Sequence, residues 1–435
     1  MRPGRRELLG GAAAVVGAAG LSWLASCDGR RGRGHEISLW FSYGGDNRRV
    51  LLELVADFNR TQDEVRIVPT FQGDYFEGLA KIRTSVFAGG TPTVSHVVGE
   101  VVPYLCAAGV LEPLDEIGGE TLGDLVPALS QAGTFERGAE RPLVALPFNR
   151  STPIAFYDKT LFAKLGLRPP RTWDELREVA IRATRRAGSG GSDRAVERWG
   201  FECPVDWWFW VALMGQAGGE LVRPSDGRVT LGEQAGVRAL ELWKDMVHRD
   251  RSMKPPPGRD YDAWQATNID FLAGRTAMIW TSTAFVRYLE RNAAFEVGAA
   301  PLPALERRAV PTGGTMFVMP RPRGGTIPTR DKQAALSFLR WMMAPTQANA
   351  WATRTGYMPV SRAGLAQLEV EGYYRSHPND RVAVEQLADA RPWPWATELF
   401  RLQREVVQPR LEEVVLRDRD AGAAMDEARR EASAE

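Results

Sequence analysis

The strongest constraint on the fold is an alternation of strand and helix patterns near the start of the chain. Residues 37–41 (ISLWF) form a short apolar run typical of a strand, and residues 46–59 place apolar side chains at helical spacing. Residues 65–71 then give a second strand pattern, and residues 76–87 give a second amphipathic helix. Strand, helix, strand and helix at this spacing predict βαβ units and a largely parallel sheet.

The same alternation returns farther along the chain. Residues 154–157 read as a strand, and Asp158 after them is a suitable N-cap for a helix. Thr172 opens a capping box, and residues 277–280 and 316–319 read as short buried strands. The chain has 435 residues, which at roughly 100–200 residues per domain is enough for two or three α/β units.

The N-terminus has the pattern of a secretory signal of the lipoprotein type. Arg5 and Arg6 precede an apolar run over residues 8–23, and Leu-Ala-Ser leads into Cys27. We therefore expect residues 1–26 to be a signal peptide and residues 27–35 to be a lipidated, flexible tether. The alternative is an uncleaved anchor, although the apolar run is shorter than the roughly 20 residues that span a bilayer. The paired arginines fit either twin-arginine export or an ordinary basic head.

Composition limits the classes of partner. The formal net charge is +1, so no global field attracts nucleic acid or an anionic membrane, and we expect no nucleic-acid partner. Cys106 and Cys203 could pair in an oxidising compartment, but we favour free thiols. We expect no metal and no cofactor, because the histidines do not have the spacing of metal ligands. They are His35, His96, His248 and His377.

Several segments, in this order along the chain, resemble the extracellular solute-binding proteins of ABC importers, in particular the carbohydrate and glycerol-phosphate group. They are DFN at 57–59, IVPTFQGDY at 67–75, PFNRSTPIAFY at 147–157, PRTWDEL at 170–176, FLAGRTAMI at 271–279 and TGYMP at 355–359. The segments PFN-x-STP, IVPT-x-x-G-x-Y and TGY-x-P are most similar to the sn-glycerol-3-phosphate-binding branch.

This resemblance implies an α/β, two-lobed periplasmic-binding-protein-like fold of type II, with discontinuous lobes, a hinge and a ligand cleft between the lobes. It places residues 36–150 and 277–315 in the first lobe and residues 151–276 and 316–435 in the second. The implied crossings lie near residues 149–153, 274–277 and 314–317.

The resemblance also implies a function. The chain would be the non-enzymatic, substrate-binding component of an importer, and the lipid expected on Cys27 would anchor it on the outer face of the cytoplasmic membrane. It would capture glycerol-3-phosphate, a glycerophosphodiester or an oligosaccharide and deliver this solute to the transmembrane permease. We expect it to act as a monomer.

An aromatic run at residues 206–210 (DWWFW) is the strongest candidate for a sugar-binding surface. Flat aromatic rings can cover the apolar face of a sugar while polar side chains reach its hydroxyls. The branch commonly places two tryptophans three residues apart here; the second aligns with Trp208, but Val205 stands at the first position. This departure favours a larger or differently shaped ligand. The alternative for Trp207, Trp208 and Trp210 is a place in the hydrophobic core.

The other candidates for ligand binding follow the matched segments. Tyr75 comes just after a strand, where parallel strands end at the ligand crevice of an α/β sheet. Arg401 is a candidate for gripping phosphate, although Phe400 competes for the aligned position and a solvated helix arginine is the alternative. The remaining candidates offer hydroxyl, amide or carboxylate groups or glycine backbone. They are Glu100, Asn149, Ser151, Ser282, Gly313, Gly314 and Tyr357.

Two other functions stay open at this point. A secreted glycoside hydrolase would need two carboxylates flanking one bond, and the segments expected at the cleft are poor in Asp and Glu. A ligand-loaded sensor that docks on a receptor would share the same binding site. The sequence does not separate such a sensor from an importer component.

Overall fold

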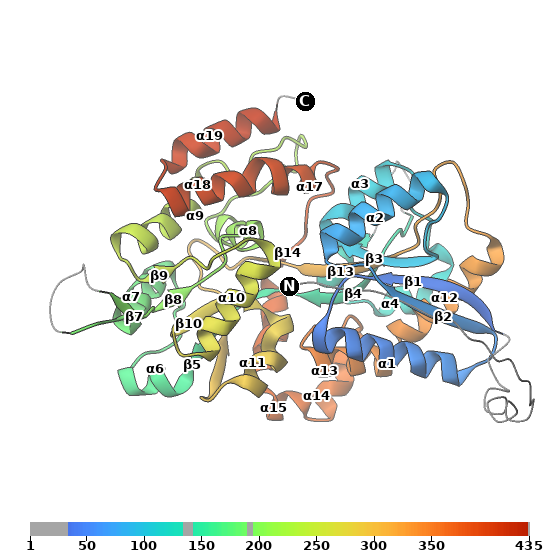
Figure 1. Ribbon diagram of the computed structural model, residues 1–435, viewed down its shortest axis with the longest axis horizontal. Helices are drawn as coiled ribbons and strands as arrows, with labels where there is room; N and C mark the ends of the chain where they lie inside the picture. The colour runs from blue at the N-terminus through green and yellow to red at the C-terminus, as the bar shows by residue number, and fades with distance from the viewer. Residues whose placement is uncertain (1–33, 134–141, 189–194, 434–435) are drawn as a thin grey trace, which may run out of the picture.

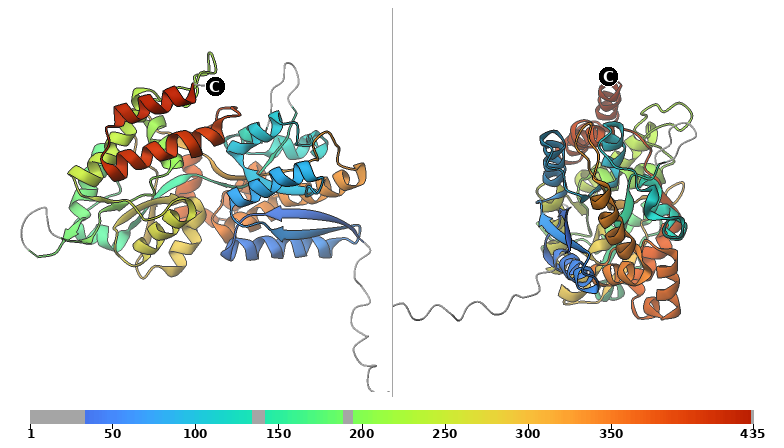
Figure 2. Two further views of the ribbon diagram at one scale, coloured as in Figure 1. Left: turned by 45° about the horizontal axis from the view of Figure 1, so that its top comes forward. Right: turned by 90° about the vertical axis from the view of Figure 1, so that its right-hand side faces the viewer.

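The computed structural model describes residues 34–133, 142–188 and 195–433, which form two α/β lobes lying side by side (Figure 1). The predicted signal peptide and Cys27 lie outside the described residues. Each lobe is built on a five-stranded sheet with helices on both faces, as the turned views in Figure 2 also show. No helix in the described part of the chain is long and apolar enough to cross a membrane.

The sheet of the first lobe has the order β2-β1-β3-β13-β4. Its strands are β1 His35–Phe41, β2 Val65–Phe71, β3 Val94–Val98, β4 Leu146–Ser151 and β13 Gly313–Val318. β1 runs parallel to β2 and β3, as predicted, but β13 is antiparallel to both β3 and β4. The sheet is therefore mixed rather than largely parallel.

Successive side chains of β13 point into two different hydrophobic cores of the first lobe, one on each face of the sheet. Phe317 faces a core with α1 Gly45–Thr61 and α12 Thr329–Met343, whereas Met316 faces a second core with α2 Tyr75–Ala88. This is the period of two that a strand buried on both faces requires. Shorter helices complete this lobe: α3 Val102–Ala107, α4 Gly119–Asp124, α5 Pro127–Ser130 and α13 Pro345–Thr355.

The sheet of the second lobe has the order β11-β5-β10-β8-β9. Its strands are β5 Pro153–Asp158, β8 Phe201–Glu202, β9 Met253–Lys254, β10 Met278–Ser282 and β11 Val297–Ala300. One face carries the largest core, with α6 Lys159–Leu165, α7 Trp173–Ala183, α8 Trp207–Gln216, α9 Gln234–Lys244, α18 Gln408–Arg417 and α19 Ala421–Ala432. The other face packs against α10 Asp260–Leu272, α11 Val286–Asn292 and α16 Pro378–Glu385.

The chain passes directly from the first sheet to the second between β4 and β5. Only Thr152 separates the two strands, and it is fully buried. Its backbone is tied to the second lobe, because Thr152 N donates to Thr283 Oγ1 at 3.3 Å and Thr283 N donates to Thr152 O at 3.1 Å. The crossing that we expected near residues 149–153 is therefore present.

Sheet membership later in the chain differs from the expected division. We expected residues 277–315 in the first lobe and 316–435 in the second. Instead, β10 and β11 pair with β5 in the second sheet, and β13 joins the first sheet. The chain returns to the first lobe at β13 rather than near residues 274–277. Apolar patterning identifies short buried strands but does not say which strand they pair with.

Two small pairings and three further short helices lie outside the main sheets. β12 Val310–Pro311 pairs with β14 Ala390–Arg391, and β6 Arg185–Arg186 pairs with β7 Val196–Arg198. The helices are α14 Arg362–Val370, α15 Tyr373–Ser376 and α17 Leu399–Arg401. α14 packs on α13, and α16 packs on β11, so this C-terminal region leads from the first lobe to the second.

Candidate functional site

Most of the predicted site residues gather where the two lobes meet. We call this group the interlobe cluster and define it as Tyr75, Glu100, Asn149, Arg150, Trp208, Gly313, Gly314 and Tyr357. Trp208 comes from the second lobe, and the other members come from the first-lobe sheet or from segments packed on it. The cluster surrounds the crossing from β4 to β5.

Tyr75 is set by the cap of its helix. It is the first residue of α2, and the Asp74 side chain accepts from Phe76 N and Glu77 N, both at 2.8 Å. The Tyr75 hydroxyl lies 3.4 Å from the Tyr357 hydroxyl and accepts from Asn149 Nδ2 at 3.3 Å. Three predicted site residues thus share one hydrogen-bonded group, and burial raises the pKa of Tyr75.

A buried relay fixes the direction of the Asn149 amide. Ser42 N donates to His96 Nε2 at 2.8 Å, which leaves His96 Nδ1 as the donor to Thr315 Oγ1 at 3.1 Å. The Thr315 hydroxyl then donates to Asn149 Oδ1, which also accepts from Thr315 N at 2.6 Å. Burial lowers the pKa of His96 to about 3, so the imidazole stays neutral in this role. The relay turns Asn149 Nδ2 toward Tyr75.

Arg150 is buried, not solvent-exposed. It is 1% exposed, and its guanidinium donates to Gly314 O at 3.0 Å and to Thr312 Oγ1 at 2.8 Å. Gly314 has φ +85°, and a Cβ on it would lie 1.7 Å from Asn149 O, so only glycine fits beside β4 here. Burial lowers the pKa of Arg150 to about 10, which leaves it cationic at neutral pH.

Trp208 brings the second lobe onto this group. Its backbone N donates to the capping carboxylate of Asp206 at 2.8 Å, which fixes the start of α8. The indole lies against Gly313, because a Cβ there would come within 2.5 Å of Trp208 Cζ2. Trp208 is 8% exposed, and its indole N–H has no hydrogen-bond partner among the described residues.

The neighbouring tryptophans belong to the core, in line with the alternative given for them above. Trp207 stacks on Trp393 with ring centroids 6.1 Å apart and is 1% exposed. Trp210 is fully buried and donates from Nε1 to Gly236 O at 3.1 Å. Val205, at the position of the missing tryptophan, packs at the edge of the same core.

Two carboxyl groups with raised pKa values lie on opposite sides of the lobe boundary, Glu100 in the first lobe and Asp206 in the second. Glu100 lies in a short turn of the first lobe, Gly99–Val101, and its Oε2 atom is buried without a hydrogen-bond partner in the described chain. The pKa of Glu100 is raised to about 7, mainly by burial; the charge of Arg150 opposes this rise and that of Asp206 adds to it. Burial also raises the pKa of Asp206 to about 6. The site is thus less poor in acidic groups than the sequence suggested.

Ser151, Ser282 and Arg401 occupy the edge of the cluster. Ser151 ends β4 and pairs with Gly313, whereas Ser282 pairs with Pro153 and its hydroxyl accepts from Ala284 N at 3.2 Å. Both serines therefore sit beside the strand crossing. Arg401 lies in α17, which packs against the turn that carries Glu100.

The segment around Arg401 also joins the lobes. Phe400 lies 6.0 Å from Phe76 between ring centroids, and the Arg404 guanidinium lies 4.2 Å from the Phe76 centroid. Arg404 is also paired with Asp260 at 2.5 Å. Aromatic and charged contacts therefore connect the C-terminal helices to the start of α2.

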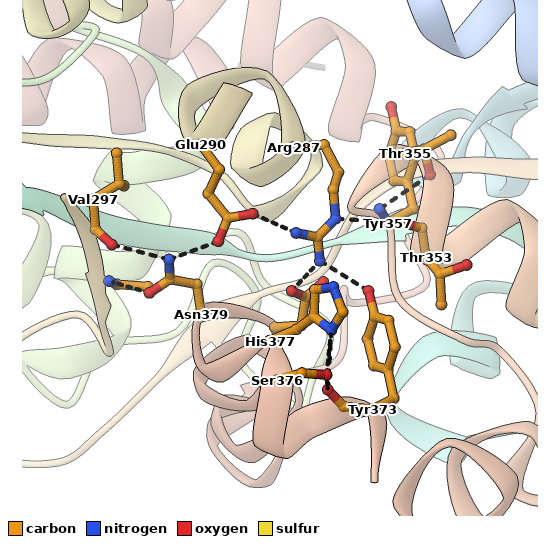
Figure 3. A network of polar contacts seen from close by, with 12 residues as sticks. Arg287, Glu290, Val297, Thr353, Thr355, Tyr357, Tyr373, Ser376, His377 and Asn379 are labelled. Atoms are coloured by element: carbon orange, nitrogen blue, oxygen red, sulfur yellow. Dashed lines mark hydrogen bonds and ion pairs between the residues drawn. The ribbon is translucent and has the colours of Figure 1, made fainter. Parts of the chain in front are cut away.

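Tyr357 is backed by a polar network between the lobes (Figure 3). Its ring stacks on Trp351 with centroids 5.7 Å apart and planes 12° apart. Behind it, Arg287 of α11 donates to Thr353 O of α13 at 3.2 Å and to the Tyr373 hydroxyl at 2.8 Å. Arg287 also forms ion pairs with Glu290 and Asp380. The Arg287 side chain thus links α11 to α13, α15 and α16, the helices that come after β13 in the chain.

Several contributors to this site were not expected from the sequence. His96, Thr315 and Arg287 act through other residues and lie in no matched segment. The one available signal for His96 was a polar side chain in the middle of the buried strand VSHVV. Cys106 and Cys203 are free thiols, as favoured above.

Comparisons with known proteins agree with this architecture. Residues 53–371 match the family described as bacterial extracellular solute-binding proteins. The chain is 25% identical over 417 residues to the sn-glycerol-3-phosphate-binding periplasmic protein UgpB of Pectobacterium atrosepticum, covering 90% of this chain and 89% of the relative.

Solved structures share the fold. UgpB from Mycobacterium tuberculosis in complex with glycerophosphocholine superposes with a TM-score of 0.78 at 23% identity, covering 92% of this chain and 98% of that one. The cyclic α-maltosyl-1,6-maltose binding protein from Arthrobacter globiformis gives a TM-score of 0.74 at 24% identity, with coverage of 92% and 98%. The predicted two-lobed α/β fold is confirmed.

Proposed function

Since the chain belongs to the bacterial extracellular solute-binding proteins, we propose that it captures a sugar or glycerol-phosphate-type solute between its two lobes and delivers it to an ABC permease. The observation that carries this proposal is the contact of Trp208 of the second lobe with Gly313 of the first, at the strand crossing where Asn149 also holds Tyr75. The solutes named for its relatives and structural neighbours, sn-glycerol-3-phosphate, glycerophosphocholine and a maltosyl-maltose, are of this kind.

The chemistry of the interlobe cluster suits such a solute. Trp208 and the tyrosines offer aromatic faces, while Glu100 Oε2 offers an acceptor for a hydroxyl group. The neutral relay through His96 holds Asn149 without adding charge. A solute that touches both lobes would favour the closed arrangement of the hinge, and the permease would then recognise this closed form.

The proposal includes a place outside the cytoplasm. A signal peptide over residues 1–26 and lipid on Cys27 would hold the mature chain, as a monomer, at the outer face of the cytoplasmic membrane. Residues 27–35 would serve as the tether. Anchoring keeps a binding protein close to the permease that receives its cargo.

The proposed function is binding without chemical change. The relatives are named as binding proteins, and no observation favours the hydrolase alternative. The raised pKa values of Glu100 and Asp206 follow from burial at the lobe boundary. Release of sugar or phosphate from a glycoside or phosphodiester by the purified protein would overturn this part of the proposal.

A ligand screen tests the proposal. Glycerol-3-phosphate, glycerophosphocholine and mono- to trisaccharides are added at about a hundredfold excess over Kd, where a bound solute stabilises the fold by about 2.7 kcal/mol. We expect at least one solute to raise the melting temperature. Tyr75→Phe should weaken that solute's binding in calorimetry, whereas Tyr104→Phe, on α3 and outside the cluster, should not. A melting temperature that no solute changes would contradict the proposal.

A further inference from the structure

Side-chain amides take the place of a neighbouring strand at the outer edge of the first-lobe sheet. β2 is the edge strand, and among the described residues no strand pairs with its outer side. Asn59 Nδ2, from α1, donates to Ile67 O at 2.9 Å, and Ile67 N donates to Asn59 Oδ1 at 2.8 Å. Gln62 makes the same pair of bonds with Val65, from Nε2 to Val65 O at 2.6 Å and from Val65 N to Oε1 at 2.7 Å. Each amide therefore occupies both backbone groups of one residue.

The two amides and a proline close successive outward positions of β2. Backbone groups of successive residues in a strand point to opposite sides, so Val65, Ile67 and Pro69 share the outer side of β2. Pro69 has no N–H to offer to a neighbouring strand. Three outward positions in a row thus lack a free donor.

The other edges of the two main sheets are closed in different ways. β4 is bridged by Met358, whose N donates to Arg150 O at 2.9 Å, and β9 has only two residues. β11 is covered by α16, where the Asn379 amide accepts from Ala299 N at 2.8 Å and donates to Val297 O at 3.1 Å (Figure 3). Of these four edge strands β2 is the longest, with seven residues, and its closure depends on two side chains.

Without the two amides, β2 would be well suited to pairing with another strand. Its sequence is VRIVPTF, and the side chains of Val68 and Phe71 are 38% and 42% exposed. An edge strand with unpaired N–H and C=O groups and exposed apolar side chains is a template for strand addition. A second copy of the chain offers the same edge, so two copies could pair β2 with β2 around a twofold axis.

We propose that the outer edge of β2 is a latent strand-pairing surface for a second copy of this chain, and that Asn59 and Gln62 hold it closed. A partner strand would have to displace the four hydrogen bonds that these amides make with β2. This inference goes beyond the proposed function, because it involves neither the solute nor the interlobe cluster.

Sedimentation velocity over a range of protein concentrations, with hydrogen–deuterium exchange of peptides that cover β2, tests the proposal. The variant Asn59→Leu/Gln62→Met keeps the size of both side chains but removes both amides. We expect its molecular mass to double as the concentration rises, whereas the unmodified protein stays monomeric. In the dilute, monomeric variant β2 should exchange about tenfold faster, because its outward N–H groups lose their acceptors. Protection should return at concentrations where the variant dimerises.

The matched control is Asn292→Leu/Gln367→Met, at exposed positions of α11 and α14 whose amides bond neighbours on the same helix. It should stay monomeric, and dimerisation equal to that of Asn59→Leu/Gln62→Met would overturn the proposal, since added apolar surface alone would then be the cause. A folded Asn59→Leu/Gln62→Met variant that stays monomeric at every concentration would also overturn it. If that variant does not fold, Gln62→Met alone should speed exchange at Val65, and unchanged exchange there would overturn the proposal.

Discussion

Replacing Arg287 should destabilise the fold much more than replacing an exposed arginine on the same helix, because Arg287 contacts several other helices. The test compares the variant Arg287→Ala with Arg291→Ala, which lies one turn later on the same helix. Both variants remove the same charge and leave the same residue in α11. They differ in what the guanidinium contacts, so the comparison cancels helix propensity and net charge.

The structure predicts very different losses in the free energy of unfolding for the two variants. Arg287 is 11% exposed in its side chain and is paired with Asp380, which is 12% exposed; Arg287 also bonds Thr353 O and the Tyr373 hydroxyl. Removing one partner of a buried ion pair costs about 3–5 kcal/mol, since the other charge stays buried. Arg291 and Asp46 are 54% and 65% exposed and 3.6 Å apart, and an exposed pair contributes about 0–1 kcal/mol.

Equilibrium unfolding in urea at pH 7, followed by tryptophan fluorescence, measures both costs. We expect Arg287→Ala to lower the free energy of unfolding by about 3–5 kcal/mol and Arg291→Ala by less than about 1 kcal/mol. Arg287→Lys should fall between them, because an ammonium cannot reach all four partners. Equal losses for Arg287→Ala and Arg291→Ala would refute the claim that this network supports the fold.

The remaining predictions concern backbone, pH and anchoring. Gly314→Ala should destabilise the fold by more than about 2 kcal/mol, because the new Cβ would meet the backbone oxygen of Asn149 at a positive φ. Gly89→Ala, at φ +78° with open space around it, should cost only the roughly 1 kcal/mol of the left-handed conformation. Equal costs for the two variants would argue against a close approach of the Gly314 and Asn149 backbones. Burial raises the pKa of Glu202 to about 8 from its usual 4.5, so the folded state binds the extra proton and the free energy of unfolding should fall as pH rises from about 4.5 to 8. Glu202→Gln should make this fall shallower in urea titrations at several pH values, and parallel curves would count against it. Cys27→Ala should release the protein from membranes in cell fractionation, whereas an unchanged distribution would favour an uncleaved anchor.

Local signals in the sequence predicted the elements of the fold well. The strand over residues 65–71 has the predicted bounds, and Asp158 and Thr172 cap their helices as expected. These features depend on a few neighbouring residues. Strand pairing does not: β10 joins β5 across more than a hundred residues of chain, and no local pattern encodes that choice. The assignment of residues 277–315 to the first lobe failed for this reason.

The candidate site also combines residues that local sequence predicts with residues whose roles depend on strand pairing. Tyr75, Asn149 and Tyr357 follow from matched segments, and the structure brings them into one hydrogen-bonded group. The support behind them could not be predicted, because His96 and Thr315 meet Asn149 only after three strands pair. The burial of Arg150 within PFNRSTP shows the same dependence, because its guanidinium reaches Gly314 O only where β4 pairs with β13.

The crystal structure of the protein with a solute identified in the ligand screen tests the central claim most directly. We predict that density for the solute lies at the interlobe cluster, in contact with Tyr75 from the first lobe and with Trp208 from the second. Density for the solute on one lobe alone, or at a site away from the strand crossing between β4 and β5, would contradict the account.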